Sequence, residues 1–158
     1  VDHKQYASRD LFDQALCQAI DEYGPGLIVL AGFMRILGAD FVKRYQGKIL
    51  NIHPSLLPNY PGTNTHQRVL DAGEKLHGVS VHFVTEELDG GPVIAQESIA
   101  IEPIDDAQTL ALKIHEKEHA LYPAVVSLFA DGRLSLNGNN AFLDEQLLPV
   151  TGQRIDDL

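Results

Sequence analysis

The sequence predicts an α/β fold: a Rossmann-like, mostly parallel sheet flanked by helices, with an antiparallel extension. Two observations carry this prediction. First, the apolar run 27–31 is followed by a short helical segment and a second apolar run, 48–52, which is typical of a βαβ unit. Second, a tight Asp-Gly-Gly-Pro turn separates the β-rich runs 77–85 and 93–101, which predicts an antiparallel pair. The 158 residues have the usual length of one domain, and we expect a single domain over 1–158.

The first elements follow from local patterns. Ser8 is a good N-cap for a helix over 9–23, whose apolar residues recur at helical spacing, and Gly24-Pro25 ends that helix. The run 27–31 is apolar on both faces, so we expect a buried central strand with a parallel neighbour. A short helix over 38–45 then precedes the second strand.

The rest of the chain begins with irregular structure and continues with longer elements. Three prolines exclude regular structure from 53–65. The remaining elements are expected in this order: helix 65–72, strand 77–85, strand 93–101, a long helix from 105 to beyond 129, and strand 133–136. Pro123 is expected to kink or divide the long helix.

The composition narrows the possible partners. Twelve Lys and Arg against 22 Asp and Glu give a formal net charge of −10, which argues against nucleic acid and anionic membrane surfaces. Cys17 is the only cysteine, which excludes a disulfide framework and suits a reducing cytoplasm. No apolar run approaches the ~18 residues of a membrane span. We therefore expect a cytoplasmic protein with no nucleic-acid or membrane partner. We also expect a monomer or a weak homodimer.

Asn51 and His53 are the first candidates for chemistry. They stand at the carboxyl end of a predicted strand, where open α/β sheets bind ligands, and their spacing of two directs both side chains to one side. Asn offers amide donors to a developing oxyanion, and His carries a proton near neutral pH. Taken alone, such a triplet more often marks a turn cap and a histidine packed at a strand end.

Asp89 is the third candidate. It occupies a turn in which Gly90 and Gly91 let another backbone or a ligand approach closely. A meeting of Asp89 with His53 would suit acyl transfer through a tetrahedral intermediate, whereas the alternative is an ordinary turn residue. No Gly-x-Ser-x-Gly motif is present, and Cys17 has no evident base, so the sequence offers no covalent nucleophile.

His115 and His119 stand four residues apart on one helix face, a spacing that can ligate a metal. The pattern is not His-Glu-x-x-His, and no third ligand is evident. A solvated, charged helix face is the better interpretation, and we expect no metal.

Three ordered motifs carry a resemblance to a known family. They are 31–37 (AGFMRIL), 51–58 (NIHPSLLP) and 82–92 (HFVTEELDGGP). Together they resemble the folate-dependent formyltransferases, and within them the members that act on glycinamide ribonucleotide. The resemblance extends from about residue 9 to residue 148.

This resemblance implies specific roles. Asn51, His53 and Asp89 match catalytic positions, at which the glycinamide amine attacks the formyl carbon of 10-formyltetrahydrofolate. The positions implied to bind this co-substrate are Arg9, Met34, Arg35, Ile36, Leu37, Asn51, Thr85, Glu86, Glu87, Leu88 and Asp89, with Arg9 facing the folate tail. Those implied to bind the ribonucleotide are His115, Glu116, Lys117 and Glu118, the last of which matches a carboxylate that holds the ribose.

One departure and two alternatives accompany the resemblance. The family opens with a strand, a Gly-rich loop and a helix N-terminus that hold the substrate phosphate. No such segment precedes Val1, and we expect a truncated chain rather than another phosphate site. A formyltetrahydrofolate deformylase, in which water replaces the amine, and a non-catalytic folate-binding module remain alternatives. The acidic charge disfavours a formyltransferase that acts on tRNA.

Overall fold

A four-stranded mixed sheet, in the order β1-β2-β3-β4, forms the centre of the molecule. The computed structural model describes all residues, 1–158. The strands are β1 (Ile28–Leu30), β2 (Ile49–His53), β3 (Leu76–Phe83) and β4 (Val93–Ala100). β1 and β2 pair in parallel, whereas β2 with β3 and β3 with β4 pair antiparallel. The predicted α/β class with an antiparallel extension is confirmed, and the parallel pairing is confined to β1 and β2.

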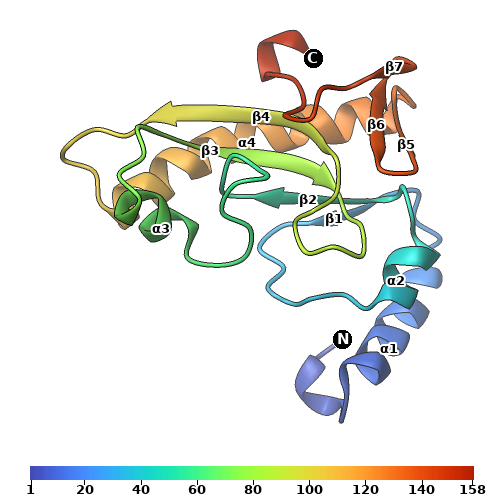
Figure 1. Cartoon of the computed structure of the whole chain (residues 1–158). Coiled ribbons are helices and arrows are strands. Elements are labelled where there is room, and N and C mark those ends of the chain that lie inside the picture. The colour runs from blue at the N-terminus through green and yellow to red at the C-terminus, as the bar shows by residue number, and fades with distance from the viewer.

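Helices cover this sheet unevenly (Figure 1). They are α1 (Arg9–Asp21), α2 (Ala39–Arg44), α3 (Thr65–Asp71) and α4 (Ala107–Ala130), with short 3-10 turns η1 (His3–Gln5) and η2 (Ile155–Asp157). α4 lies along one face of β3 and β4, while α1 and α2 lie together beyond the end of the sheet (Figure 1).

The predicted helix boundaries are confirmed to within a few residues, and their caps explain them. The Ser8 hydroxyl accepts the Leu11 amide at the start of α1. Asp106 and Thr109 form a capping box at the start of α4. Pro123 does not divide α4, because the helix continues unbroken to Ala130.

The main core lies between the sheet and α4. Its fully buried side chains include Leu50, Val79, Val81, Phe83, Ile94, Ile114, Leu121 and Val125. The buried Tyr122 hydroxyl of α4 donates to the carbonyls of Leu30 and Leu50, at 2.8 and 2.9 Å, and so ties β1 and β2 to the helix. No helix combines the length and the apolar character that a membrane span needs.

One expectation about the strands is wrong, and one expected strand lies in a second sheet. The run 27–31 is not buried on both faces: only β1 forms within it, at the edge of the sheet, and Val29 is 46% exposed. The predicted strand 133–136 forms as β5 (Leu134–Asn137), but it belongs to a separate small sheet with β6 (Asn140–Leu143) and β7 (Gln146–Leu147). The hairpin turn at Gly138-Asn139, which joins β5 to β6, was not predicted.

β3 is buried on both of its faces. All of its residues except Leu76 are buried. Its polar face is covered by the segment that follows β2, since the Ser80 hydroxyl donates to the Ser55 carbonyl and accepts the Leu57 amide. The histidines of β3 are therefore buried together with its valines.

Candidate functional site

Asn51 and His53 lie within the last three residues of β2, at the carboxyl end of the parallel pair that β2 forms with β1. Pairing with β3 places Asn51 opposite His82, and His53 opposite Ser80. His53 is buried, with 6% of its surface exposed, and Asn51 is half-buried. The predicted placement of both residues at a strand end is confirmed, and their burial follows from the 54–60 segment folding back over β3.

Asp89 is brought to His53 by a strained turn. Its backbone is left-handed, with φ of +50°, a conformation that a non-glycine residue adopts at a cost. A Cβ on Gly91 would lie 1.8 Å from the Phe83 carbonyl oxygen, so only glycine allows this close approach. Asp89 Oδ2 lies 3.5 Å from His53 Nδ1, and the carboxylate is only 9% exposed. The predicted meeting of Asp89 and His53 is present.

The hydrogen bonds of His53 fix which nitrogen faces the carboxylate. Its Nε2 lies 2.9 Å from the Tyr60 carbonyl oxygen, which is an acceptor only, so Nε2 carries the proton and donates. In the neutral ring, Nδ1 then carries the lone pair beside Asp89. Nδ1 is therefore the ring nitrogen that faces the Asp89 carboxylate.

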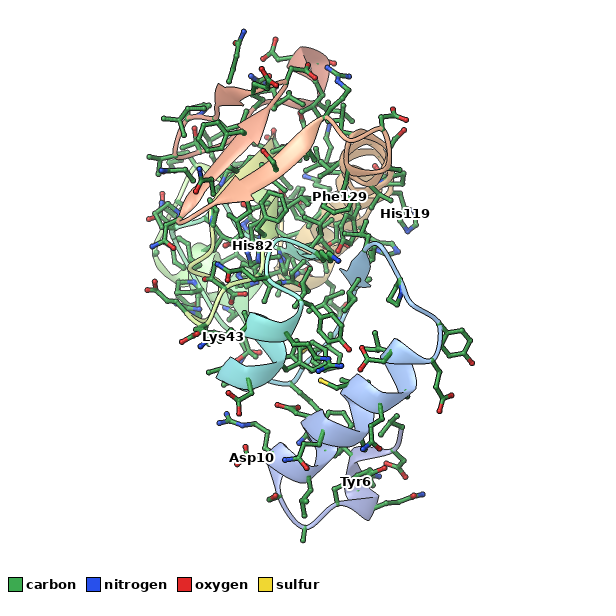
Figure 2. All side chains as sticks on the ribbon, turned by 90° about the vertical axis from the view of Figure 1, so that its right-hand side faces the viewer. Tyr6, Asp10, Lys43, His82, His119 and Phe129 are labelled. Carbon is green, nitrogen blue, oxygen red and sulfur yellow. The ribbon has the colours of Figure 1, made fainter.

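His82 is a member of this cluster that sequence reasoning did not assign a role. Its Nδ1 donates to the Phe83 carbonyl at 2.9 Å, which leaves Nε2 as an acceptor 3.2 Å from the Asn51 amide nitrogen. Burial lowers the pKa of His82, which favours this neutral form. His82 Nε2 also lies 3.8 Å from Asp89 Oδ1. Figure 2 shows His82 deep within the molecule.

His82 therefore orients the amide of Asn51. One N–H of that amide points to His82, and the other remains available to a ligand. No local pattern indicated this role, because His82 meets Asn51 across two neighbouring strands, 31 positions away in the chain.

A pocket adjoins this cluster, between the β1–α2 loop and the segment that follows β3. Its lining comprises Leu30, Phe33, Arg35, Ile36, Leu37, Val42, Asn51, His82, Val84, Thr85, Glu86, Glu87, Leu88 and Asp89. Most of the residues that the resemblance implied for the co-substrate thus surround one pocket, with Asn51 and Asp89 in its wall. Met34 is 79% exposed and does not line it.

Arg9 lies apart from that pocket. It lines a cleft between α1 and α2, together with Asp10, Asp13 and Arg44. Arg35, rather than Arg9, is the basic side chain that lines the pocket. The expectation that Arg9 faces a ligand tail stays a prediction.

The predicted segment His115–Glu118 occupies α4. His115 Nδ1 lies 3.1 Å from Glu118 Oε2, with His115 exposed and Glu118 half-buried. Burial lowers the pKa of His66, and the charge of Glu118 opposes this with a smaller rise. His66 Nδ1 is in turn 2.8 Å from His77 Nε2. No group of three or more His, Cys, Asp or Glu is arranged to hold a metal ion.

Burial, with smaller contributions from the charges of His66 and His53, lowers the pKa of His77 to about 4. The charge of one histidine thus affects the pKa of another within a group of four: His53, His66, His77 and His82. The segment containing Glu118 borders the same group of side chains.

Comparison with known proteins gives consistent results. The sequence profile of the formyl transferase family matches residues 1–126. The chain is 51% identical to phosphoribosylglycinamide formyltransferase of Escherichia coli over 96% of its own length and 72% of the length of that protein. It is 48% identical to part of the trifunctional purine biosynthetic protein adenosine-3 of Gallus gallus, over 86% of this chain and 14% of that protein.

Solved structures agree. Phosphoribosylglycinamide formyltransferase of Coxiella burnetii superposes with a TM-score of 0.92 and 52% identity, over 96% of this chain and 72% of the other. A formyltetrahydrofolate deformylase of Pseudomonas syringae superposes with a TM-score of 0.81 and 25% identity, over 90% of this chain and 47% of the other.

Proposed function

This chain belongs to the formyl transferase family, and on that premise we propose that it transfers a formyl group from 10-formyltetrahydrofolate to the amine of glycinamide ribonucleotide in purine biosynthesis. The observation that carries the proposal is the meeting of His53 and Asp89, 3.5 Å apart, beside the half-buried Asn51 in the wall of one pocket. Amide donor, proton carrier and carboxylate are the groups that acyl transfer to an amine needs.

The reaction exchanges a formyl group for a proton. The amine nitrogen of the ribonucleotide attacks the formyl carbon, and the carbonyl electron pair moves to oxygen to give a tetrahedral oxyanion. Collapse of this intermediate breaks the bond from carbon to N10 of the folate. The amine loses one proton, and N10 gains one.

Asn51 is suited to stabilise the oxyanion. Its amide is oriented by His82, which accepts one of its two N–H groups, and the second N–H can donate to the negative oxygen. A donor that is held in place before the reaction stabilises the transition state without reorganising.

His53 and Asp89 are suited to manage the proton. The Nδ1 lone pair of His53 can accept a proton, and the Asp89 carboxylate beside it can accept the resulting N–H as a hydrogen bond. Tyr60 holds the opposite nitrogen, so that the ring cannot turn away without losing a hydrogen bond. The pair therefore provides a general acid and base at a fixed position.

The pocket between the β1–α2 loop and the segment after β3 is suited to the folate head. Phe33, Ile36 and Leu37 offer apolar contacts to a flat ring, and the irregular backbone around them leaves polar groups free to bind its edge. Glu118 is proposed to bind the ribose of the ribonucleotide. Its proximity to His66, which feels its charge, supports a position near the group of histidines.

A deformylase is the second candidate, favoured by the superposition with the Pseudomonas syringae protein. The decisive experiment supplies 10-formyltetrahydrofolate with and without glycinamide ribonucleotide and measures both products. Formylated ribonucleotide supports the proposal, whereas formate released at the same rate without the ribonucleotide supports a deformylase. Folate binding with neither product would support a non-catalytic module.

A further inference from the structure

The wall of the pocket formed by the β1–α2 loop has no backbone hydrogen bonds of its own. Residues 31–37 make none with the rest of the chain. Leu37 is buried, but Met34 and Ile36 are 79% and 54% exposed. Because backbone pairing does not fix this loop, its shape depends on side chains that reach it from other elements.

Two consecutive residues of α1 reach it. Asp13 Oδ2 accepts the Gly38 amide at 2.7 Å, at the point where the loop enters α2. Phe12 lies beneath Arg35, whose guanidinium carbon is 5.0 Å from the ring centroid. Asp13 is 6% exposed and Phe12 4% exposed, so the α1 side of both contacts is buried.

The contact between Asp13 and Gly38 is close enough to restrict the sequence. A Cβ on Gly38 would lie 2.9 Å from Asp13 Oδ2. The Gly38 backbone, with φ of −71° and ψ of 159°, is one that alanine adopts readily. A side chain at position 38 would therefore displace the Asp13 carboxylate without straining the backbone.

The buried carboxylate makes a single hydrogen bond, through Oδ2. Asp13 Oδ1 has no hydrogen-bond partner and is shielded from solvent, although the residue borders the cleft between α1 and α2. A buried carboxylate with one charge-assisted bond is costly to keep unless that bond stabilises a particular arrangement. The arrangement that this bond fixes is the end of the loop.

We propose that Asp13 is a positioning residue for the folate-binding wall, with Phe12 as its apolar support. It holds the end of the loop at Gly38 so that Phe33, Ile36 and Leu37 face the flat head of the formyl donor. This inference rests on the proposed function, since it takes the pocket to be the folate site. Neither residue touches the ligand in this account; both act through the loop.

The first test compares four variants for tetrahydrofolate affinity. Asp13→Ala is expected to raise the Kd for tetrahydrofolate roughly tenfold, because it removes the bond to Gly38. Gly38→Ala is expected to do the same from the other side of the contact. Asp13→Asn keeps an acceptor oxygen and is expected to restore most of the affinity. Asp10→Ala, an exposed neighbour on the same helix, is the matched control.

The second test needs no folate. Trypsin cleavage after Arg35 reports how often the loop leaves its place, and cleavage after the exposed Arg154, far away in sequence, serves as the internal reference. In Asp13→Ala, cleavage after Arg35 is expected to accelerate roughly tenfold relative to cleavage after Arg154. Asp13→Asn and Asp10→Ala should cleave like the parent chain.

The two tests separate this inference from the proposed function. Unchanged cleavage after Arg35 in Asp13→Ala would overturn the inference, whether or not folate binds. A parent chain that does not bind tetrahydrofolate would contradict the proposed function, with the cleavage assay still deciding the role of Asp13 in the loop. The KM for the ribonucleotide should stay unchanged in Asp13→Ala; a parallel rise in both KM values would mean a general structural role and would also overturn the inference.

Discussion

The Asp89 carboxylate accepts the Gly62 amide at 2.8 Å through Oδ2, the same oxygen that faces His53. Gly62 belongs to the irregular segment after β2, and Asp89 belongs to the turn before β4. The same oxygen therefore joins these two loops and faces the His53 ring. The carboxylate therefore has a structural task and a proposed chemical task, and substitutions can separate them.

Asp89→Asn is expected to abolish the charge while keeping an oxygen that accepts the Gly62 amide. We expect kcat to fall by about 10²–10⁴-fold, the usual contribution of general acid–base catalysis, with the melting temperature nearly unchanged. Asp89→Ala should lose both the charge and the hydrogen bond, and so lower kcat and the melting temperature together. Wild-type turnover in Asp89→Asn would show that the charge is not needed.

The contact between His66 and the buried His77 leads us to expect that the protein loses stability in acid. Burial lowers the pKa of His77 from 6.5 to about 4, so between these values the unfolded chain binds a proton that the folded chain does not. Stability is therefore complete above the unfolded pKa and falls as the pH drops from 6.5 towards 4. The shift corresponds to at most about 3 kcal/mol.

This prediction is checked by denaturant unfolding at pH 7.5 and pH 5. The free energy of unfolding of the parent chain should be smaller at pH 5. His77→Gln, which can still hydrogen-bond to His66 but does not titrate, should show a weaker dependence on pH. An equal loss of stability in both proteins would assign the acid sensitivity to other groups.

Removing the Tyr122 hydroxyl is expected to lower the stability of the protein without creating a cavity. Tyr122→Phe keeps the ring but leaves the carbonyls of Leu30 and Leu50 without their donor, and we expect a loss of about 1–3 kcal/mol in the free energy of unfolding. Tyr23→Phe is the control, because that side chain belongs to a residue 86% exposed. Equal stability of the two variants would mean that water replaces the hydroxyl without cost.

Local patterns predicted most of the elements, because caps, prolines and apolar periodicity act over a few residues. Ser8 marks the start of α1, and the prolines mark the irregular segment after β2. The exposure of Val29 was missed because an apolar run does not reveal how many neighbours its strand has. The small sheet was missed because its hairpin turn lies in a polar segment with weak alternation.

The site was predicted in part for the same reason. The position of Asn51 and His53 follows from a strand end, which is a local feature. The contact of Asp89 with His53 depends on a turn 36 positions later in the chain, and spacing alone did not establish it. The roles of His82 and Asp13 depend on tertiary contacts, with Asn51 and with the Gly38 amide, and no sequence pattern indicated either.

The last prediction concerns the turn that carries Asp89. A Cβ on Gly91 would come within 1.8 Å of the Phe83 carbonyl oxygen, so Gly91→Ala must push the turn away from β3 and move Asp89 from His53. We expect kcat to fall by roughly 10²-fold or more, as for the loss of the carboxylate itself, and the melting temperature to fall as well. Gly26→Ala is the matched control, because a Cβ at that position would meet no atom within 4 Å and the Gly26 φ is not positive. The test measures the kinetics and the thermal unfolding of the two variants. Normal turnover in Gly91→Ala would mean that the turn can move away from β3 without displacing the carboxylate. The proposed dependence of catalysis on this close approach would then be wrong.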